Sequence, residues 1–251
     1  MLHYKAVITA LAALLLGACN NAEQAKPEED TSVKIDFVEY EKNSEPYPTR
    51  LIVTNKFMRF DDGEDSTSFL LFDRDGNTIY SVNDDDRTVM SVESQDIDLE
   101  PPMELNLEEH NLGTLEDAPA IEGKEPQHYE FSANGDICYN VVAVEDLMPD
   151  VVEAMKAFTT ILADDSKVTF NNMPADLHDA CDMSMSTFAA GRHLKHGFPI
   201  QEWSVDGAGR TLVDYDKDYE PDPALFEVPG EDYQHFSVQE MREGKVTGGG
   251  H

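Results

Sequence analysis

Four side chains that could bind a transition metal lie between residues 178 and 196, and they are His178, Asp182, His193 and His196. His178 and Asp182 are spaced i,i+4, and His193 and His196 are spaced i,i+3, so each pair can share one face of a helix. Imidazole and carboxylate groups bind Zn²⁺, and imidazole also suits Cu²⁺. Solvated histidines near a helix C-terminus are the opposing interpretation, because a positive charge there favours the helix dipole. A metal-binding protein is therefore the alternative function.

Other motifs of catalysis or ligand binding are missing from the sequence. It contains no Gly-x-Ser-x-Gly elbow, Ser-x-x-Lys pair, His-Glu-x-x-His pair or phosphate-binding loop. The stretch Asp73-Arg74-Asp75-Gly76-Asn77 resembles a calcium loop, but its glycine is at position four instead of six, and position twelve is Asp84 instead of glutamate. A turn explains this stretch better. We expect a protein that is not an enzyme and needs no cofactor.

A short apolar leader opens the chain. Lys5 precedes an apolar run over residues 6–16, which fits a secretory signal but is too short to span a bilayer. The run ends in Leu16-Gly17-Ala18-Cys19, which resembles the lipobox of bacterial lipoproteins. The resemblance implies cleavage after residue 18 and acylation of Cys19, so that several acyl chains anchor the protein to a membrane. Because residue 20 is asparagine and not aspartate, the resemblance further implies the outer membrane, on its periplasmic side.

Cysteine usage agrees with export. If Cys19 carries lipid, Cys138 and Cys181 are the two cysteines that remain, and they allow a single intramolecular pairing. In an oxidising compartment a disulfide is the default. A reactive thiol pair is the other possibility, although the Cys-x-x-Cys spacing of redox sites is absent.

The charge of the chain restricts its partners. Its 251 residues include 51 Asp and Glu against 18 Lys and Arg, which gives a formal net charge of −33. This charge excludes a main role in binding nucleic acid, and it opposes docking on an anionic lipid surface. Contact with a membrane should therefore come through the acyl anchor. The acidity indicates either a surface for cationic partners or adaptation for solubility in a saline habitat.

The residues that follow the leader predict one α+β domain. Residues 19–31 are polar and form a flexible tether, residues 32–240 form the domain, and residues 241–251 form a disordered tail. Alternating apolar and polar side chains predict antiparallel strands. Their ranges are 33–40, 50–60, 68–72, 77–82, 88–92, 128–132, 136–144, 199–205, 210–215, 225–229 and 233–238. Residues 97–125, acidic and proline-containing, are predicted as a long surface excursion.

A helical insert is predicted over residues 148–196. Asp150-Val151-Val152-Glu153 is typical of a capping box, and an apolar stripe follows it at helical spacing. A second helix is predicted over 175–194, with Cys181 on its inward face. From there Cys181 could reach Cys138 on the preceding strand, and the bridge would fix the helix pair to the sheet.

Three short stretches resemble uncharacterised envelope lipoproteins of gammaproteobacteria: Arg59-Phe60-Asp61-Asp62-Gly63, Leu71-Phe72-Asp73-Arg74 and Leu225-Phe226-Glu227-Val228-Pro229. These look like distant relatives of the lipoprotein-carrier (LolA and LolB type) half-barrels. The resemblance implies a curved antiparallel sheet packed on a pair of helices, with a cleft between them. We expect a binding or envelope-maintenance lipoprotein whose partner is a lipid-like ligand or another envelope protein.

Overall fold

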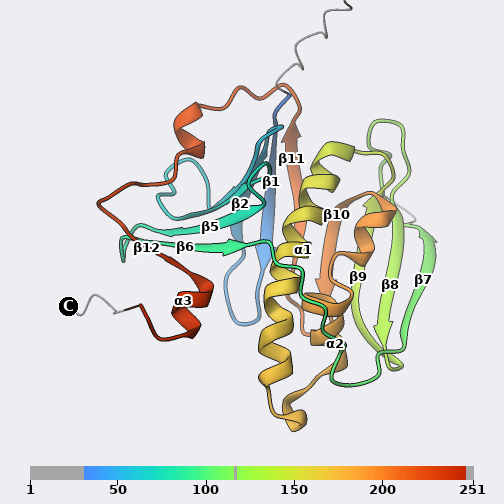
Figure 1. Ribbon diagram of the computed structural model, residues 1–251. Coiled ribbons are helices and arrows are strands. Elements are labelled where there is room, and N and C mark those ends of the chain that lie inside the picture. The colour runs from blue at the N-terminus through green and yellow to red at the C-terminus, as the bar shows by residue number, and fades with distance from the viewer. Residues whose placement is uncertain (1–30, 116–117, 247–251) are drawn as a thin grey trace, which may run out of the picture.

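The structure is a computed structural model that describes residues 31–115 and 118–246. The leader, Cys19 and the tether up to residue 30 lie outside the described residues, as do residues 247–251 of the tail. Within the described part, twelve strands form one open sheet in the order β12-β6-β5-β4-β3-β2-β1-β11-β10-β9-β8-β7 (Figure 1). The prediction of an α+β fold built on an antiparallel sheet is confirmed, with one exception at the edge, where β12 pairs with β6 in parallel.

The sheet consists of two meanders that meet at one seam. The first meander contains β1 (Val33–Tyr40), β2 (Tyr47–Val53), β3 (Phe57–Asp61), β4 (Phe69–Asp73), β5 (Thr78–Asn83) and β6 (Thr88–Glu93). The second contains β7 (Leu107–Thr114), β8 (Gln127–Ala133), β9 (Asp136–Val144), β10 (Phe198–Ser204) and β11 (Gly209–Asp216), and β12 (Gln234–Ser237) adds to the far edge of the first. The seam is the antiparallel pair β1–β11, which shifts register between Asp36 and Phe37.

Two predicted features of the strands are wrong. The strand predicted over 50–60 is a hairpin of β2 and β3, because Thr54 accepts hydrogen bonds from the amides of Lys56 and Phe57 and thereby turns the chain. The surface excursion predicted over 97–125 contains β7, which pairs with β8 along the sheet edge. Most β7 side chains are exposed, so the strand lacks the alternation that marks a half-buried strand.

One long helix crosses the sheet. α1 (Pro149–Asn172) contacts β5, β6 and β10, and it lies across the face of the sheet in Figure 1. Its buried residues Val151, Val152 and Met155 pack in one core with Ile35 and Phe37 of β1. The predicted capping box at Asp150 is not formed: the N-cap is Met148, in a left-handed conformation and without a side-chain bond, and Pro149 occupies the first turn.

The second helix predicted over 175–194 is broken into short helical segments. They are η1 (Ala175–Leu177), α2 (Ala180–Met183), the π-helical η2 (Ser184–Phe188) and η3 (Arg192–His196). The breaks occur at His178, which is extended, and at Gly191, which is left-handed with φ of 67°. The second helix is therefore not continuous, and the packing of the sheet on a pair of helices remains a prediction.

A disulfide fixes these short segments to the sheet. Cys138 of β9 and Cys181 of α2 are joined, with a Cα–Cα distance of 5.1 Å. The predicted pairing is confirmed. Around the bridge, Phe131, Tyr139 and Val141 form a second apolar cluster against which Cys181 and Met185 pack.

The end of the chain differs from the prediction in two places. The strand predicted over 225–229 is absent, and η4 (Pro223–Phe226) begins where Asp222 caps the first turn. Part of the tail predicted as disordered is ordered, because α3 (Val238–Arg242) starts at a complete capping box of Ser237 and Glu240. Arg242 then binds both carboxylate oxygens of Asp165 on α1, at 2.6 and 2.7 Å.

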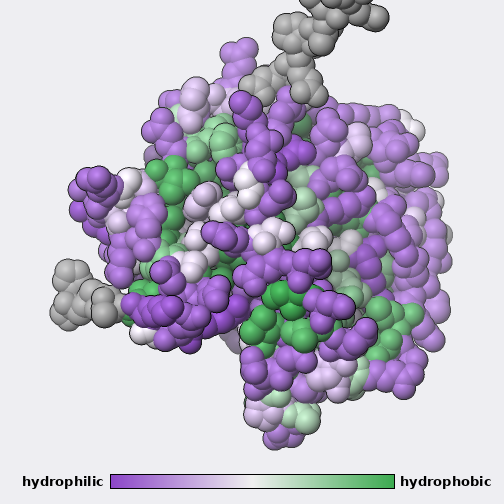
Figure 2. Space-filling view, viewed as in Figure 1, coloured by the Kyte–Doolittle hydropathy of each residue, from purple (hydrophilic) through white to green (hydrophobic). Residues whose placement is uncertain are grey.

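The surface is mostly hydrophilic. Figure 2 shows hydrophilic residues over most of the front face, with hydrophobic residues in several separate patches between them. In the part of the chain that the structure describes, no helix has the length and apolar character needed to cross a bilayer.

Candidate functional site

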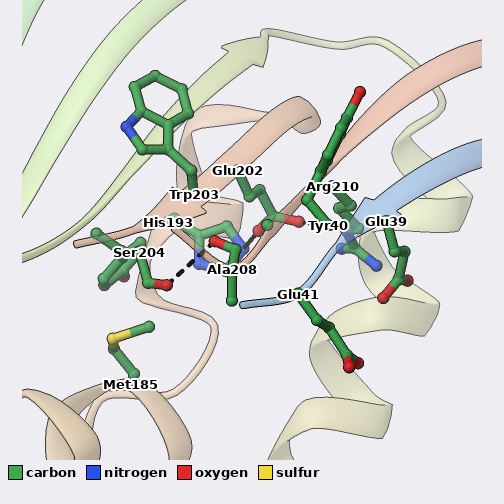
Figure 3. A pocket seen from close by; sticks show the side chains of 12 residues that line it. Glu39, Tyr40, Glu41, Met185, His193, Glu202, Trp203, Ser204, Ala208 and Arg210 are labelled. Atoms are coloured by element: carbon green, nitrogen blue, oxygen red, sulfur yellow. Dashed lines mark hydrogen bonds and ion pairs between the residues drawn. The ribbon is translucent and has the colours of Figure 1, made fainter. Parts of the chain in front are cut away.

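Two pockets with different chemistry lie on the sheet. The first, which we call the seam pocket, lies where β1, β10 and β11 meet, and it has a volume of about 380 Å³ (Figure 3). Its walls come from residues far apart in sequence: Glu39, Tyr40, Glu41, Tyr139, Met185, His193, Glu202, Trp203, Ser204, Ala208, Gly209 and Arg210. The β1–β11 and β10–β11 pairings place Glu39 and Glu202 on either side of Arg210.

Glu202 is the centre of the seam pocket. Its Oε1 lies 2.9 Å from Nε2 of His193 and its Oε2 lies 2.5 Å from Nε of Arg210, while its side chain is 18% exposed. Burial alone would raise the pKa of Glu202, but the charges and hydrogen bonds of Arg210 and His193 outweigh it and hold the pKa at about 2. Glu202 is therefore a carboxylate at neutral pH with both oxygens in use.

Two further carboxylates stand at the rim on the β1 side. Thr49 donates to Glu39 at 3.2 Å, and the Tyr47 hydroxyl donates to Glu41 at 2.6 Å. The bond to Glu41 is the main reason that the pKa of Tyr47 rises to about 12, so this hydroxyl keeps its proton. Figure 3 shows the Trp203 ring turned away from His193 and Glu202, and this ring packs against His128 at 5.2 Å between centroids.

Glu202 itself is not suited to donate a proton at neutral pH. An ionised Glu202 cannot act as a general acid at neutral pH, since a useful acid keeps a pKa near the working pH. Ser204, the hydroxyl nearest to this carboxylate in sequence, donates to Asp206 and to the Ala208 carbonyl. What the pocket offers is fixed charges of both signs beside the apolar side chains of Met185 and Tyr139.

The second pocket, which we call the tether pocket, lies where the described chain begins. It has a volume of about 720 Å³ and is lined by Thr31, Ser32, Thr54, Lys56, Phe57, Lys217, Asp218, Tyr219, Glu220, Pro221, Pro223, Phe226 and Glu227. Phe57 of β3 and Phe226 of η4 stack with their ring centroids 5.5 Å apart. Ser32 donates to the Tyr219 carbonyl, so the first described residues pack directly against this pocket.

The predicted metal ligands do not form a common site. His178 directs Nε2 at the carbonyls of Phe170 and Met173, at 3.2 and 3.1 Å. His196 lies 3.3 Å from Glu109, whereas His193 pairs with Glu202. Among residues 31–115 and 118–246, no group of three or more His, Cys, Asp or Glu side chains is placed to hold a metal ion.

Asp182, the fourth predicted ligand, is near other acids. Burial first, and then the charges of Asp179 and Asp206, raise its pKa. Its own amide is bonded to the Asp179 carboxylate, which caps α2. Asp182 therefore lies in the first turn of α2, which the Asp179 side chain caps.

The sequence prediction missed Glu202 and Arg210 altogether. They are opposite each other on the β10–β11 hairpin, and the turn at Asp206-Gly207 was itself recognisable. Counting residues back from that turn places Glu202 opposite Arg210 on the hairpin, so this ion pair could have been predicted from the sequence. The contribution of His193 could not, because it depends on how η3 folds over the sheet.

The fold is α+β, with a wide open sheet and two pockets on it. No protein-family model matches the chain, and no curated protein matches it. Among solved structures, the chain is similar to PNGF-II in a C2 crystal form, with a TM-score of 0.39 at 10% identity over 85% of this chain and 32% of that one. The chain is also similar to PNGF-II in a P21 crystal form, with a TM-score of 0.38 at 9% identity over 85% of this chain and 33% of that one. The chain spans about a third of the length of PNGF-II. No functional conclusion follows from similarities this weak.

Proposed function

We propose that the chain is a lipid-anchored protein of the bacterial envelope that binds a lipid-like ligand, without catalysing a reaction. It would be attached through Cys19 and face the periplasm from the outer membrane. The observation that carries this proposal is the tether pocket, which combines an apolar wall with nearby lysines at the point where the tether joins the domain. Another envelope protein remains the alternative partner.

The composition of the tether pocket suits an amphiphile. The stacked rings of Phe57 and Phe226, with Tyr219 and two prolines, offer apolar surface to an acyl chain. Lys56 and Lys217 lie at the same pocket beside the carboxylates of Asp218, Glu220 and Glu227, and an anionic headgroup would pair with the two lysines. Lys217 also contacts Glu122 at 2.5 Å. The volume lies within the range of about 300–1,000 Å³ that is typical of small-ligand sites.

The position of the pocket suits a ligand taken from the bilayer. Residues 20–31 of the predicted tether, fully extended, span at most about 40 Å, because an extended residue spans about 3.3–3.6 Å. With Cys19 in the membrane, the pocket would therefore stay close to the lipid surface. The overall negative charge would keep the body of the domain off an anionic leaflet, as expected for a protein held by its anchor.

Binding of a fluorescent fatty acid to the full chain in detergent tests the ligand. We expect saturable binding that weakens about tenfold in Phe226→Ala, since loss of a buried aromatic contact costs about 1.5 kcal/mol or more. Leu177→Ala is the matched control, because this side chain is apolar, 62% exposed and outside the pocket. Equal affinities for the two variants would remove the tether pocket from the proposal.

The anchor needs its own test. Mass spectrometry of the mature protein should show an N-terminal cysteine that carries acyl chains, and Cys19→Ser should release the protein from the membrane fraction. A wild-type chain recovered without acyl groups would refute the anchor, whatever the pocket binds.

A further inference from the structure

We propose that the seam pocket binds a zwitterion of amino-acid size, with Arg210 receiving its carboxylate and Glu39 and Glu41 receiving its ammonium group. The inference goes beyond the proposed function, because it concerns a different pocket with a different ligand. It rests on the presence of fixed charges of both signs on separate strands of one cavity of about 380 Å³.

Arg210 supplies the positive side of the pocket. Its Nε is bonded to Glu202, and its guanidinium lies over the Phe37 ring at 4.9 Å from the centroid. A guanidinium has five N–H donors in a rigid fork. In the described chain, Arg210 is bonded to Glu202 through its Nε, so its two terminal nitrogens can donate to a ligand. Phe37 and Glu202 hold the guanidinium group in place at the pocket, and a carboxylate is the group that such a fork binds best.

Glu39 and Glu41 supply the negative side. Glu39 pairs with Arg210 across the β1–β11 seam, and Glu41 follows two residues later at the end of the strand. The hydroxyls of Thr49 and Tyr47 hold these carboxylates in place, which lowers the entropy that a ligand must remove on binding. Figure 3 shows both glutamates on the β1 side and His193, Ser204 and Met185 on the other.

A ligand with charge of only one sign would match this pocket poorly. An anion would meet the carboxylates of Glu39 and Glu41 as well as Arg210, in a chain whose formal net charge is −33. A simple cation would leave the donors of Arg210 facing the ligand without an acceptor, and unpaired polar groups in a desolvated site reduce affinity. A zwitterion meets both requirements. Met185 and Tyr139 on the wall favour an apolar side chain on that ligand.

Isothermal titration of the full chain with L-leucine tests the inference, and two analogues that each lack one charge serve as comparisons. Isoamylamine lacks the carboxylate and isocaproate lacks the ammonium group. We expect L-leucine to bind and each analogue to bind at least tenfold more weakly, since a hydrogen bond to a charged group contributes about 1.5–3 kcal/mol.

Variants at the rim separate binding from folding. Glu39→Gln with Glu41→Gln should weaken L-leucine binding about tenfold or more, because both side chains lie at the pocket and neither is part of the core. Glu45→Gln is the matched control: it makes the same change on the exposed loop after β1, outside the pocket, and should bind like the wild type. Arg210→Lys should also bind weakly, because lysine keeps the charge but lacks the fork.

The inference is overturned if L-leucine gives no heat of binding at millimolar concentration, or if isoamylamine binds as tightly as L-leucine. Unchanged affinity in the Glu39→Gln, Glu41→Gln variant would overturn it as well. None of these results bears on fatty-acid binding at the tether pocket, so the two proposals can fail separately.

Discussion

Asp61 is a buried carboxylate shared by two buried arginines. It receives bonds from Arg50 at 3.0 Å to each oxygen, from Arg59 at 2.5 Å and from the Gly63 amide at 3.1 Å. The Asp61 side chain is fully buried, and those of Arg50 and Arg59 are 6% and 4% exposed. Arg59 also donates to the Leu225 carbonyl at 2.7 Å, so the cluster connects the sheet to η4.

Replacing Asp61 with asparagine should destabilise the fold strongly. The change leaves two guanidinium groups in a desolvated position without their counterion, and removing one partner of a buried ion pair costs about 3–5 kcal/mol. The cost should lie in the upper half of this range because Asp61 serves two cations. Some of it is offset by the cation–π contact of Arg59 with Phe69, whose ring centroid is 3.7 Å from the guanidinium carbon.

Urea unfolding at neutral pH measures the effect. Asp61→Asn should lower the unfolding midpoint by the equivalent of about 4 kcal/mol with little change in slope, because the surface exposed on unfolding is similar. Asp36→Asn is the matched control, since its pair with Lys34 is half-buried at the surface (35% and 28% exposed) and solvent-accessible pairs contribute about 0–1 kcal/mol. A loss below about 1 kcal/mol in Asp61→Asn would contradict the view that the arginines remain buried and charged without it.

Three further results are expected. Replacing Cys138 and Cys181 by alanine together should lower stability by about 4 kcal/mol in urea, because the bridge closes a loop of 43 residues; a loss near zero would contradict the loop-entropy argument. Glu202→Gln should lower the free energy of unfolding by about 3 kcal/mol at neutral pH. The pKa of Glu202 in the folded protein is about 2, below the ordinary 4.5, so the stabilisation by this carboxylate is lost as the pH falls. The difference in stability between the variant and the wild type should therefore disappear between pH 4.5 and 2. Arg242→Ala should speed hydrogen exchange in α3 alone and cost at most about 1 kcal/mol, because its pair with Asp165 is 31% and 16% exposed.

Strands with one buried face could be predicted from the sequence. Residues 33–40 alternate with period two, and β1 has those bounds. The hairpin of β2 and β3 was missed because its turn, Thr54-Asn55-Lys56, contains neither glycine nor proline and only three polar residues separate the two apolar runs. β7 was missed for the opposite reason: it is an exposed edge strand, and burial imposes no pattern on it.

The helical insert shows why local signals can mislead. Residues 150–153 have the side chains of a capping box, yet the left-handed Met148 ends the preceding turn and Pro149 starts the helix. The capping box that does form, at Ser237 and Glu240, lies at the end of the strand predicted over 233–238 and just before the predicted tail. The disulfide could be predicted, because two cysteines left only one pairing and both were expected on neighbouring inward faces.

The buried charges were the hardest features to predict. Arg59 and Asp61 resemble the exposed face of an alternating strand, and they are buried because η4, more than 160 residues later, covers that face. Glu202 is equally ordinary in sequence, and its low pKa depends on His193 of η3 and Arg210 of the next strand. Such groups gain their role only from contacts between distant segments.

The two pockets rest on separate charge networks, which lie on opposite faces of the sheet. Arg210 lies over Phe37, which packs with α1 in the core, so the Glu202 network is on the face that α1 covers. Arg59 follows Met58, a residue of the same core, and therefore points to the other face, where it holds η4 beside the tether pocket. Distant sites without shared partners usually have additive free energies. The costs of Asp61→Asn and Glu202→Gln should therefore add, and each change should weaken binding chiefly at the pocket that its own network supports.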